Sequence, residues 1–151
     1  MKRVVLLAVL LIAACASTYT GPLSVRILQA GMFGPGEVGR RGRNLYTTAK
    51  IVRETDTIPA EVGAGFGIRF LAERPTGGIV PLRVRFTHPP IDGREVDEST
   101  ANYSSGTPVV IGSYFAKTTD LQAGPWTIEL FSGDRLMASH SFQVIHATPL
   151  H

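Results

Sequence analysis

Residues 126–144 read WTIELFSGDRLMASHSFQV, and their spacing is the strongest indication of fold class in the chain. Apolar residues alternate with polar ones in two runs, a spacing typical of strands that bury one face. The apolar members are Trp126, Ile128, Leu130, Leu136, Ala138, Phe142 and Val144. Between the runs, Gly133 and Asp134 suit a two-residue turn of type II′. The stretch therefore predicts an antiparallel β-hairpin.

The same alternation occurs upstream in residues 66–70 and 80–86, where phenylalanine and aliphatic residues alternate with arginines. Further strand-like runs cover residues 23–30, 45–53 and 109–117, and no segment keeps a helical period. About seven short antiparallel strands predict an all-β protein, an immunoglobulin-like β-sandwich. Classical immunoglobulin domains add a buried disulfide, which this chain cannot form because Cys15 is its only cysteine.

Two long polar stretches separate these strands. Residues 33–44 hold four glycines, Pro35 and three arginines, and residues 88–107 are polar and rich in turn-forming residues. Both are predicted to be long loops, and residues 55–65 a turn-rich connection. Loops of this kind often carry binding surfaces.

Composition narrows the class of protein. The chain has 151 residues, 44% of them hydrophobic and 18% charged, which suits one folded domain and excludes predominant disorder. A single cysteine excludes a disulfide scaffold and a four-cysteine zinc site.

The first residues have the pattern of a cleaved export signal. Lys2 and Arg3 precede eleven apolar residues, Val4 to Ala14, a run too short to span a bilayer but suited to a signal peptide. We therefore expect a signal peptide over 1–14, a flexible tether over 15–22, the sandwich over 23–147 and a tail over 148–151.

Ile12-Ala13-Ala14-Cys15 resembles the bacterial lipobox. The resemblance implies cleavage before Cys15, a diacylglycerol on its sulfur and an acyl chain on its freed amine. A protein with two or more acyl chains is anchored stably. Since Ala16 is not aspartate, the sorting rule for such proteins favours the outer membrane if the organism is Gram-negative. The alternative is a plain secreted protein cut after Ala16.

Charge gives no indication of nucleic-acid binding. The whole chain has 15 basic and 12 acidic residues, but removing Lys2 and Arg3 leaves 13 basic residues, a net charge of +1. The basic isoelectric point therefore comes partly from the signal peptide.

Three segments resemble an uncharacterised bacterial family, domain of unknown function 3859. They are residues 58–68 (IPAEVGAGFGI), His88-Pro89-Pro90, and the stretch from Gly124-Pro125-Trp126 to Phe142-Gln143-Val144. The resemblance covers roughly residues 23–146 and implies no established activity and no catalytic residue.

No constellation in the sequence indicates catalysis or a bound metal. Along the last predicted strand, His140 and His146 lie about 20 Å apart, too far to share a metal. His88 is expected to end a strand or make a hydrogen bond. The carboxylates of 92–98 lack calcium-loop spacing and are expected in a solvated loop. No serine sits in a nucleophile elbow. We expect neither an enzyme nor a cofactor beyond the lipid.

Arginines are the one feature that favours a ligand. Arg69, Arg83 and Arg85 are expected to point outward from adjacent or near-adjacent strands, and Arg40, Arg41 and Arg43 crowd one loop. Guanidinium groups pair with carboxylates and phosphates in bidentate fashion. The alternative is a solvated surface in which Glu73 and Glu129 neutralise the arginines.

These patterns predict a lipid-anchored envelope protein whose sandwich is a non-catalytic binding or scaffolding module. Its expected partners are the membrane, through the lipid, and an envelope protein or anionic polymer. The alternative is an inhibitor of a periplasmic or host hydrolase that inserts one loop into an active site.

Overall fold

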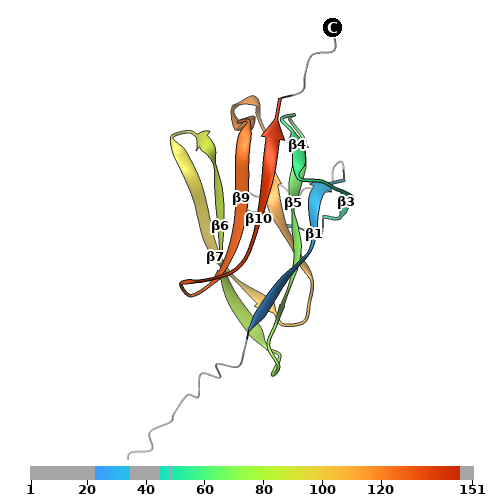
Figure 1. The fold of residues 1–151 in the computed structure, drawn as a ribbon, viewed down its shortest axis with the longest axis vertical. Coiled ribbons are helices and arrows are strands. Elements are labelled where there is room, and N and C mark those ends of the chain that lie inside the picture. Colours follow the sequence, from blue (N-terminus) through green and yellow to red (C-terminus); the bar gives the residue numbers. More distant parts are fainter. Residues whose placement is uncertain (1–22, 35–44, 48, 147–151) are drawn as a thin grey trace, which may run out of the picture.

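The alternating strands form two five-stranded sheets that pack face to face (Figure 1). A computed structural model describes residues 23–34, 45–47 and 49–146, with backbone only for 45–47. Sheet A has the order β2 (Leu45–Thr47), β8 (Val109–Tyr114), β5 (Gly65–Glu73), β1 (Ser24–Phe33) and β3 (Ile51–Glu54). Sheet B has the order β4 (Thr57–Pro59), β10 (Arg135–Ile145), β9 (Gly124–Ser132), β6 (Ile79–Ile91) and β7 (Arg94–Ser104). The predicted fold class, an all-β sandwich, is confirmed.

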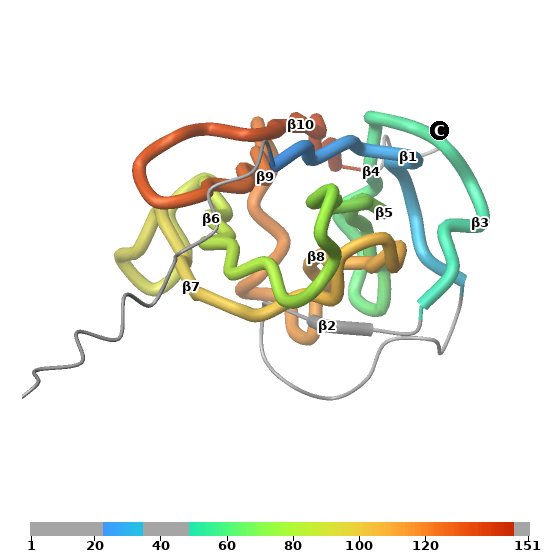
Figure 2. The backbone as a smooth tube through the Cα atoms, turned by 90° about the horizontal axis from the view of Figure 1, so that it is seen from below, coloured from blue at the N-terminus to red at the C-terminus, as the bar shows by residue number. Residues whose placement is uncertain are grey.

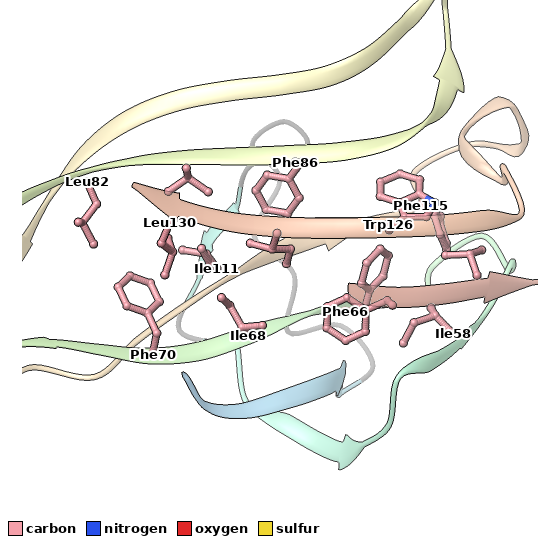
Figure 3. Packing of buried hydrophobic residues seen from close by; sticks show 14 of the residues in the cluster. Ile58, Phe66, Ile68, Phe70, Leu82, Phe86, Ile111, Phe115, Trp126 and Leu130 are labelled. Atoms are coloured by element: carbon pink, nitrogen blue, oxygen red, sulfur yellow. The ribbon is translucent and has the colours of Figure 1, made fainter. Parts of the chain in front are cut away.

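Inward-facing residues of both sheets form one core, with Phe66 at the centre of an aromatic group (Figure 3). The Phe66 ring lies 5.5 Å from Trp126, 5.6 Å from Phe115 and 5.1 Å from Phe142, measured between ring centroids. Tilted and edge-on packing of this kind adds to the hydrophobic gain of burying the rings. The core therefore joins β5 of sheet A to β9 and β10 of sheet B.

The hairpin predicted from residues 126–144 is confirmed. Ser132 pairs with Arg135 across a two-residue turn, and Gly133 has φ of 58°, as the first position of a type II′ turn requires. His140 pairs with Ile128 and lies on the same face as Phe142, whose ring it contacts, as its position in the alternation predicted; at the side of the sandwich it is only half-buried.

The prediction of a long loop over 88–107 is wrong. Strand β6 continues to Ile91, and Asp92 and Gly93, with φ of 51° and 77°, make the type I′ turn into β7. β7 is polar because it is the last strand of sheet B, with its outer face and its free edge in water. Its polarity therefore reflects an edge position and not a loop.

The structure describes ten strands where about seven were expected. The predicted strand over 45–53 is divided into β2 and β3, and β4 lies within the predicted connection 55–65. β4 pairs with β10 in parallel, while the other strand pairs in the described residues are antiparallel. The predicted signal, tether and tail, and all but the first residues of the loop 33–44, lie outside the described residues.

The sandwich has two distinct ends along its long axis (Figure 1). β1 begins at Ser24 opposite Glu73, beside the turn that joins β5 to β6. The Asp92–Gly93 turn, the short 3₁₀ helix η1 (Thr118–Asp120) and the end of β10 lie at the opposite end. No helix in the described residues is long and apolar enough to cross a membrane.

Candidate functional site

The predicted arginine face is divided between the two sheets. Arg83 and Arg85 point outward from β6 of sheet B, whereas Arg69 points outward from β5 of sheet A. The expectation that all three lie on adjacent or near-adjacent strands is therefore wrong for Arg69. Arg40, Arg41 and Arg43 lie outside the described residues.

Arg83 and Arg85 are paired with two glutamates in a group that we call the charged ladder: Arg83, Arg85, Glu98 and Glu129. Nη1 of Arg83 and Nε of Arg85 donate to the two carboxylate oxygens of Glu98, at 3.1 and 2.8 Å. Nη1 of Arg85 lies 3.9 Å from Glu129 Oε2. With two cations and two anions, the charged ladder is locally neutral and is not a basic patch.

An aromatic ring fixes the two guanidinium groups of the ladder. Their central carbons lie 4.6 and 4.9 Å from the centroid of Phe131, which is only 9% exposed although it belongs to the outer face. Cation–π contacts of this kind are stabilising. Nη2 of Arg83 also donates to the Gly133 carbonyl at 3.3 Å, so the ladder connects β7, β6 and the β9–β10 turn.

Glu98 is expected to titrate below an ordinary glutamate. Hydrogen bonds from Arg85 and then Arg83 lower the pKa of Glu98 from its usual 4.5, because both favour the charged carboxylate. The ladder's contribution to stability is thus present above pH 4.5 and is lost as the pH falls through the lowered pKa. Carbon-detected NMR titration measures this midpoint.

Arg85→Gln should raise the Glu98 midpoint toward 4.5, whereas Arg26→Gln, which removes an arginine that contacts Glu73 instead, should leave it in place. An unchanged Glu98 midpoint in Arg85→Gln would contradict the geometry of the ladder.

Arg69 lies in a polar chain across the outer face of sheet A. Its Nη1 donates to Gln29 Oε1 at 3.4 Å, and Gln29 Nε2 donates to Glu54 Oε1 at 3.0 Å. An open depression of about 530 Å³ borders Arg69, Gln29 and Val110. This arginine is thus oriented toward β1 and β3 and away from the ladder.

His88 is buried inside the sandwich and does not end its strand. Its ring stacks on Trp126 with 4.8 Å between centroids, Nδ1 donates to the Pro89 carbonyl at 2.8 Å, and Nε2 lies 3.2 Å from Asp97 Oδ2. The His88 side chain is 1% exposed and that of Asp97 15%, so the histidine ring is shielded from solvent. The expected hydrogen bond is confirmed, while Asp97 and Glu98 are engaged in the sheet and not in a solvated loop.

A groove on the side of the sandwich brings together residues that were not predicted to meet. We call it the side groove; it has a volume of about 390 Å³ and is open to solvent. Its lining consists of Ile27, Leu28, Gln29, Ala30, Glu54, Thr55, Asp56 and His140. His140 Nε2 lies 2.8 Å from Asp56 Oδ1, which connects β10 to the segment before β4. In the described residues, no group of three or more His, Cys, Asp or Glu side chains is placed to hold a metal.

The two-sheet arrangement places the protein in the class of immunoglobulin-like β-sandwiches. It is similar to the crystal structure of an immunoglobulin-like protein from Pseudomonas aeruginosa, with a TM-score of 0.65 and 24% identity over 84% of this chain and 99% of that chain. The model of the family described as Domain of unknown function (DUF3859) matches residues 22–144, so the chain belongs to that family. No curated protein matches the chain.

The Pseudomonas chain is covered almost completely by the match, so that chain consists of little more than this sandwich. The fully buried members of the core cluster lie within residues 58–144, and partly buried residues of β1 pack against them. The described sandwich therefore corresponds to almost the whole of the Pseudomonas chain.

Proposed function

We propose that this chain is a lipid-anchored protein of the bacterial envelope whose sandwich is a non-catalytic binding or scaffolding module. The observation that carries the proposal is Ile12-Ala13-Ala14-Cys15 at the end of an eleven-residue apolar run. Small residues before the cysteine let a peptidase approach the backbone, and the thiol accepts the lipid. In a Gram-negative organism, Ala16 favours the outer membrane over retention at the inner one.

The length of the tether limits where the sandwich can lie. Nine peptide steps join Cys15 to Ser24, and at most about 3.6 Å per residue they reach roughly 30 Å. We therefore expect the end of the sandwich with Ser24 and the β5–β6 turn to lie nearest the membrane. The Asp92–Gly93 turn lies at the far end of β6, about 40 Å away for thirteen strand residues at 3.3 Å each.

The charged ladder supports a protein partner better than an anionic polymer. Its arginines are already satisfied by Glu98 and Glu129, so a polyanion would have to displace those carboxylates. Substituting the arginines is therefore expected to affect domain stability more than binding of anionic polymers.

Cys15→Ala should release the protein from the membrane fraction and block lipoprotein processing. Without the thiol there is no site for the diacylglycerol, and the run of Val4 to Ala14 is too short to hold the chain in a bilayer permanently. Fractionation of cells that express the full chain measures the release, and mass spectrometry of the amino-terminal peptide measures the lipid.

Ser17→Ala is the matched control, because it changes the tether and leaves Cys15 in place; it should remain in the membrane fraction. An unmodified amino terminus at Ser17 in the native protein would overturn the proposal in favour of plain secretion.

A further inference from the structure

The side groove lies where both sheets lack an edge strand. β3 pairs with β1 only at Gly31–Phe33, and β4 pairs with β10 only at Gln143–Ile145. β1 runs beside β10 on this side of the sandwich (Figure 2). Residues 25–30 of β1 and 136–142 of β10 therefore have no strand on their outer edges among the described residues.

An uncovered edge of this kind presents backbone N–H and C=O groups to any extended chain of suitable sequence. A register shift between Ile27 and Gln29 turns Leu28 outward, where it is 38% exposed. Val25, Ile27 and Ala138 are only partly buried against the core along the same side. A further strand would cover these apolar side chains and pair the free edge of β1.

The charges of the side groove favour a basic occupant. Glu54 uses Oε1 to accept from Gln29, and Asp56 uses Oδ1 to contact His140; the second oxygen of each carboxylate has no partner among the described residues. The eight lining residues include two carboxylates and neither lysine nor arginine. A lysine or arginine side chain placed between Glu54 and Asp56 could donate a hydrogen bond to the second carboxylate oxygen of each residue.

We propose that the side groove receives an extended segment of a partner protein, which pairs with residues 25–30 of β1 and places a basic side chain between Glu54 and Asp56. This inference rests on the binding role proposed above. A second copy of the chain is the poorer occupant, because antiparallel self-pairing of β1 requires the two long axes to point in opposite directions. Two copies anchored in one membrane by tethers of about 30 Å would both have the Ser24 end nearest the membrane, which opposes that arrangement.

The other long free edge is a poorer acceptor. β7 has charged residues at four of its first five positions, Arg94, Glu95, Asp97 and Glu98, and Asp97 points inward. Edge charges and inward-pointing charges oppose the addition of a strand. β7 is therefore the internal comparison for the test.

The test is an NMR titration of isotope-labelled residues 23–146, the described sandwich, which corresponds to almost the whole of the Pseudomonas chain. The probe is a ten-residue peptide of alternating threonine and valine with glycine-serine ends and one central lysine. We expect it to shift the amide signals of residues 25–30 and to slow their hydrogen exchange. A peptide with glutamate in place of the lysine should bind at least fivefold more weakly in low salt.

The paired variant Glu54→Gln/Asp56→Asn should lose this preference for lysine. Glu61→Gln/Asp134→Asn, which removes the same charge from two exposed positions outside the groove, should keep it. Shifts confined to β7, equal binding of the two peptides, or no shift at millimolar peptide would each overturn the proposal. Because the titration uses the unanchored domain, its outcome is independent of whether Cys15 is lipidated.

Discussion

Replacing Trp126 with alanine is expected to lower the free energy of unfolding by about 3–5 kcal/mol, the usual cost of deleting a large buried aromatic side chain. Trp126 is 2% exposed and contacts the rings of Phe66 in sheet A, Phe115 just after β8, and His88 in sheet B. Its removal leaves a cavity between rigid strands that cannot collapse without breaking their ladders. The effect should therefore lie at the upper end of core substitutions.

Urea denaturation followed by circular dichroism measures this loss, since Trp126 is the chain's only tryptophan and its fluorescence disappears with the substitution. Trp126→Phe is the control: it keeps a ring in the core but removes the indole N–H that donates to the Gln122 carbonyl at 3.2 Å. It should cost clearly less than alanine. A loss below about 1 kcal/mol for Trp126→Ala would contradict the central position of the ring.

The core could be predicted from the sequence because strand alternation is a local property. Phe66, Ile68 and Phe70 lie on one face of β5 whatever the rest of the chain does, and all three are fully buried. Gly133 and Asp134 likewise specify their turn through backbone conformation alone. Features of this kind depend only on residues within one strand or one turn.

The position of the arginines could not be predicted in the same way. Alternation shows that Arg69 and Arg83 point away from the core, but it does not show to which sheet each strand belongs. Sheet membership depends on pairing between distant segments, and β5 and β6 are consecutive strands of opposite sheets. The arginines that were predicted to share one face are therefore divided between two sheets, because strand pairing depends on distant parts of the sequence.

Polar composition concealed β7, although a local signal for it was present. Asp92-Gly93 is a favoured pair for a type I′ turn, and it joins β6 directly to β7. His88, Pro89 and Pro90 obscured it: these three residues oppose Glu95 alone as a bulge in β6, and prolines cannot donate to the ladder. The prolines interrupt the pairing without ending the strand.

The side groove could not be predicted because three separate segments form it. Residues 27–30, 54–56 and His140 contribute to its lining, and Asp56 and His140 are 84 residues apart in sequence. These three segments come together only because β3 and β4 extend a short distance along β1 and β10. No pattern within any one segment specifies those lengths.

Gly67→Ala is expected to destabilise the domain by about 3 kcal/mol or more, above the usual cost of overpacking, because the added methyl group meets backbone. Gly67 and Gly112 pair across β5 and β8, and a Cβ at Gly67 would overlap the Ile111 carbonyl oxygen and lie 2.6 Å from the Gly112 Cα. The Phe33 ring also covers this spot, with Cζ 2.8 Å from the same Cβ. A flexible side chain could move aside, but a central pair of strands cannot.

Gly93→Ala separates this clash from the ordinary cost of replacing a glycine. Gly93 has φ of 77° and nothing within 4 Å of an added Cβ, so only its backbone conformation resists the change, at about 1 kcal/mol. Urea denaturation of both variants compares the two costs directly. A Gly67→Ala domain that is too unstable to give a dispersed NMR spectrum would agree with the large destabilisation expected for that variant. If the Gly67→Ala and Gly93→Ala variants unfold at the same urea concentration, β5 and β8 are not packed as closely as the structure has them. The close approach of these strands explains why this part of the sequence needs Gly67 between two core residues, Phe66 and Ile68.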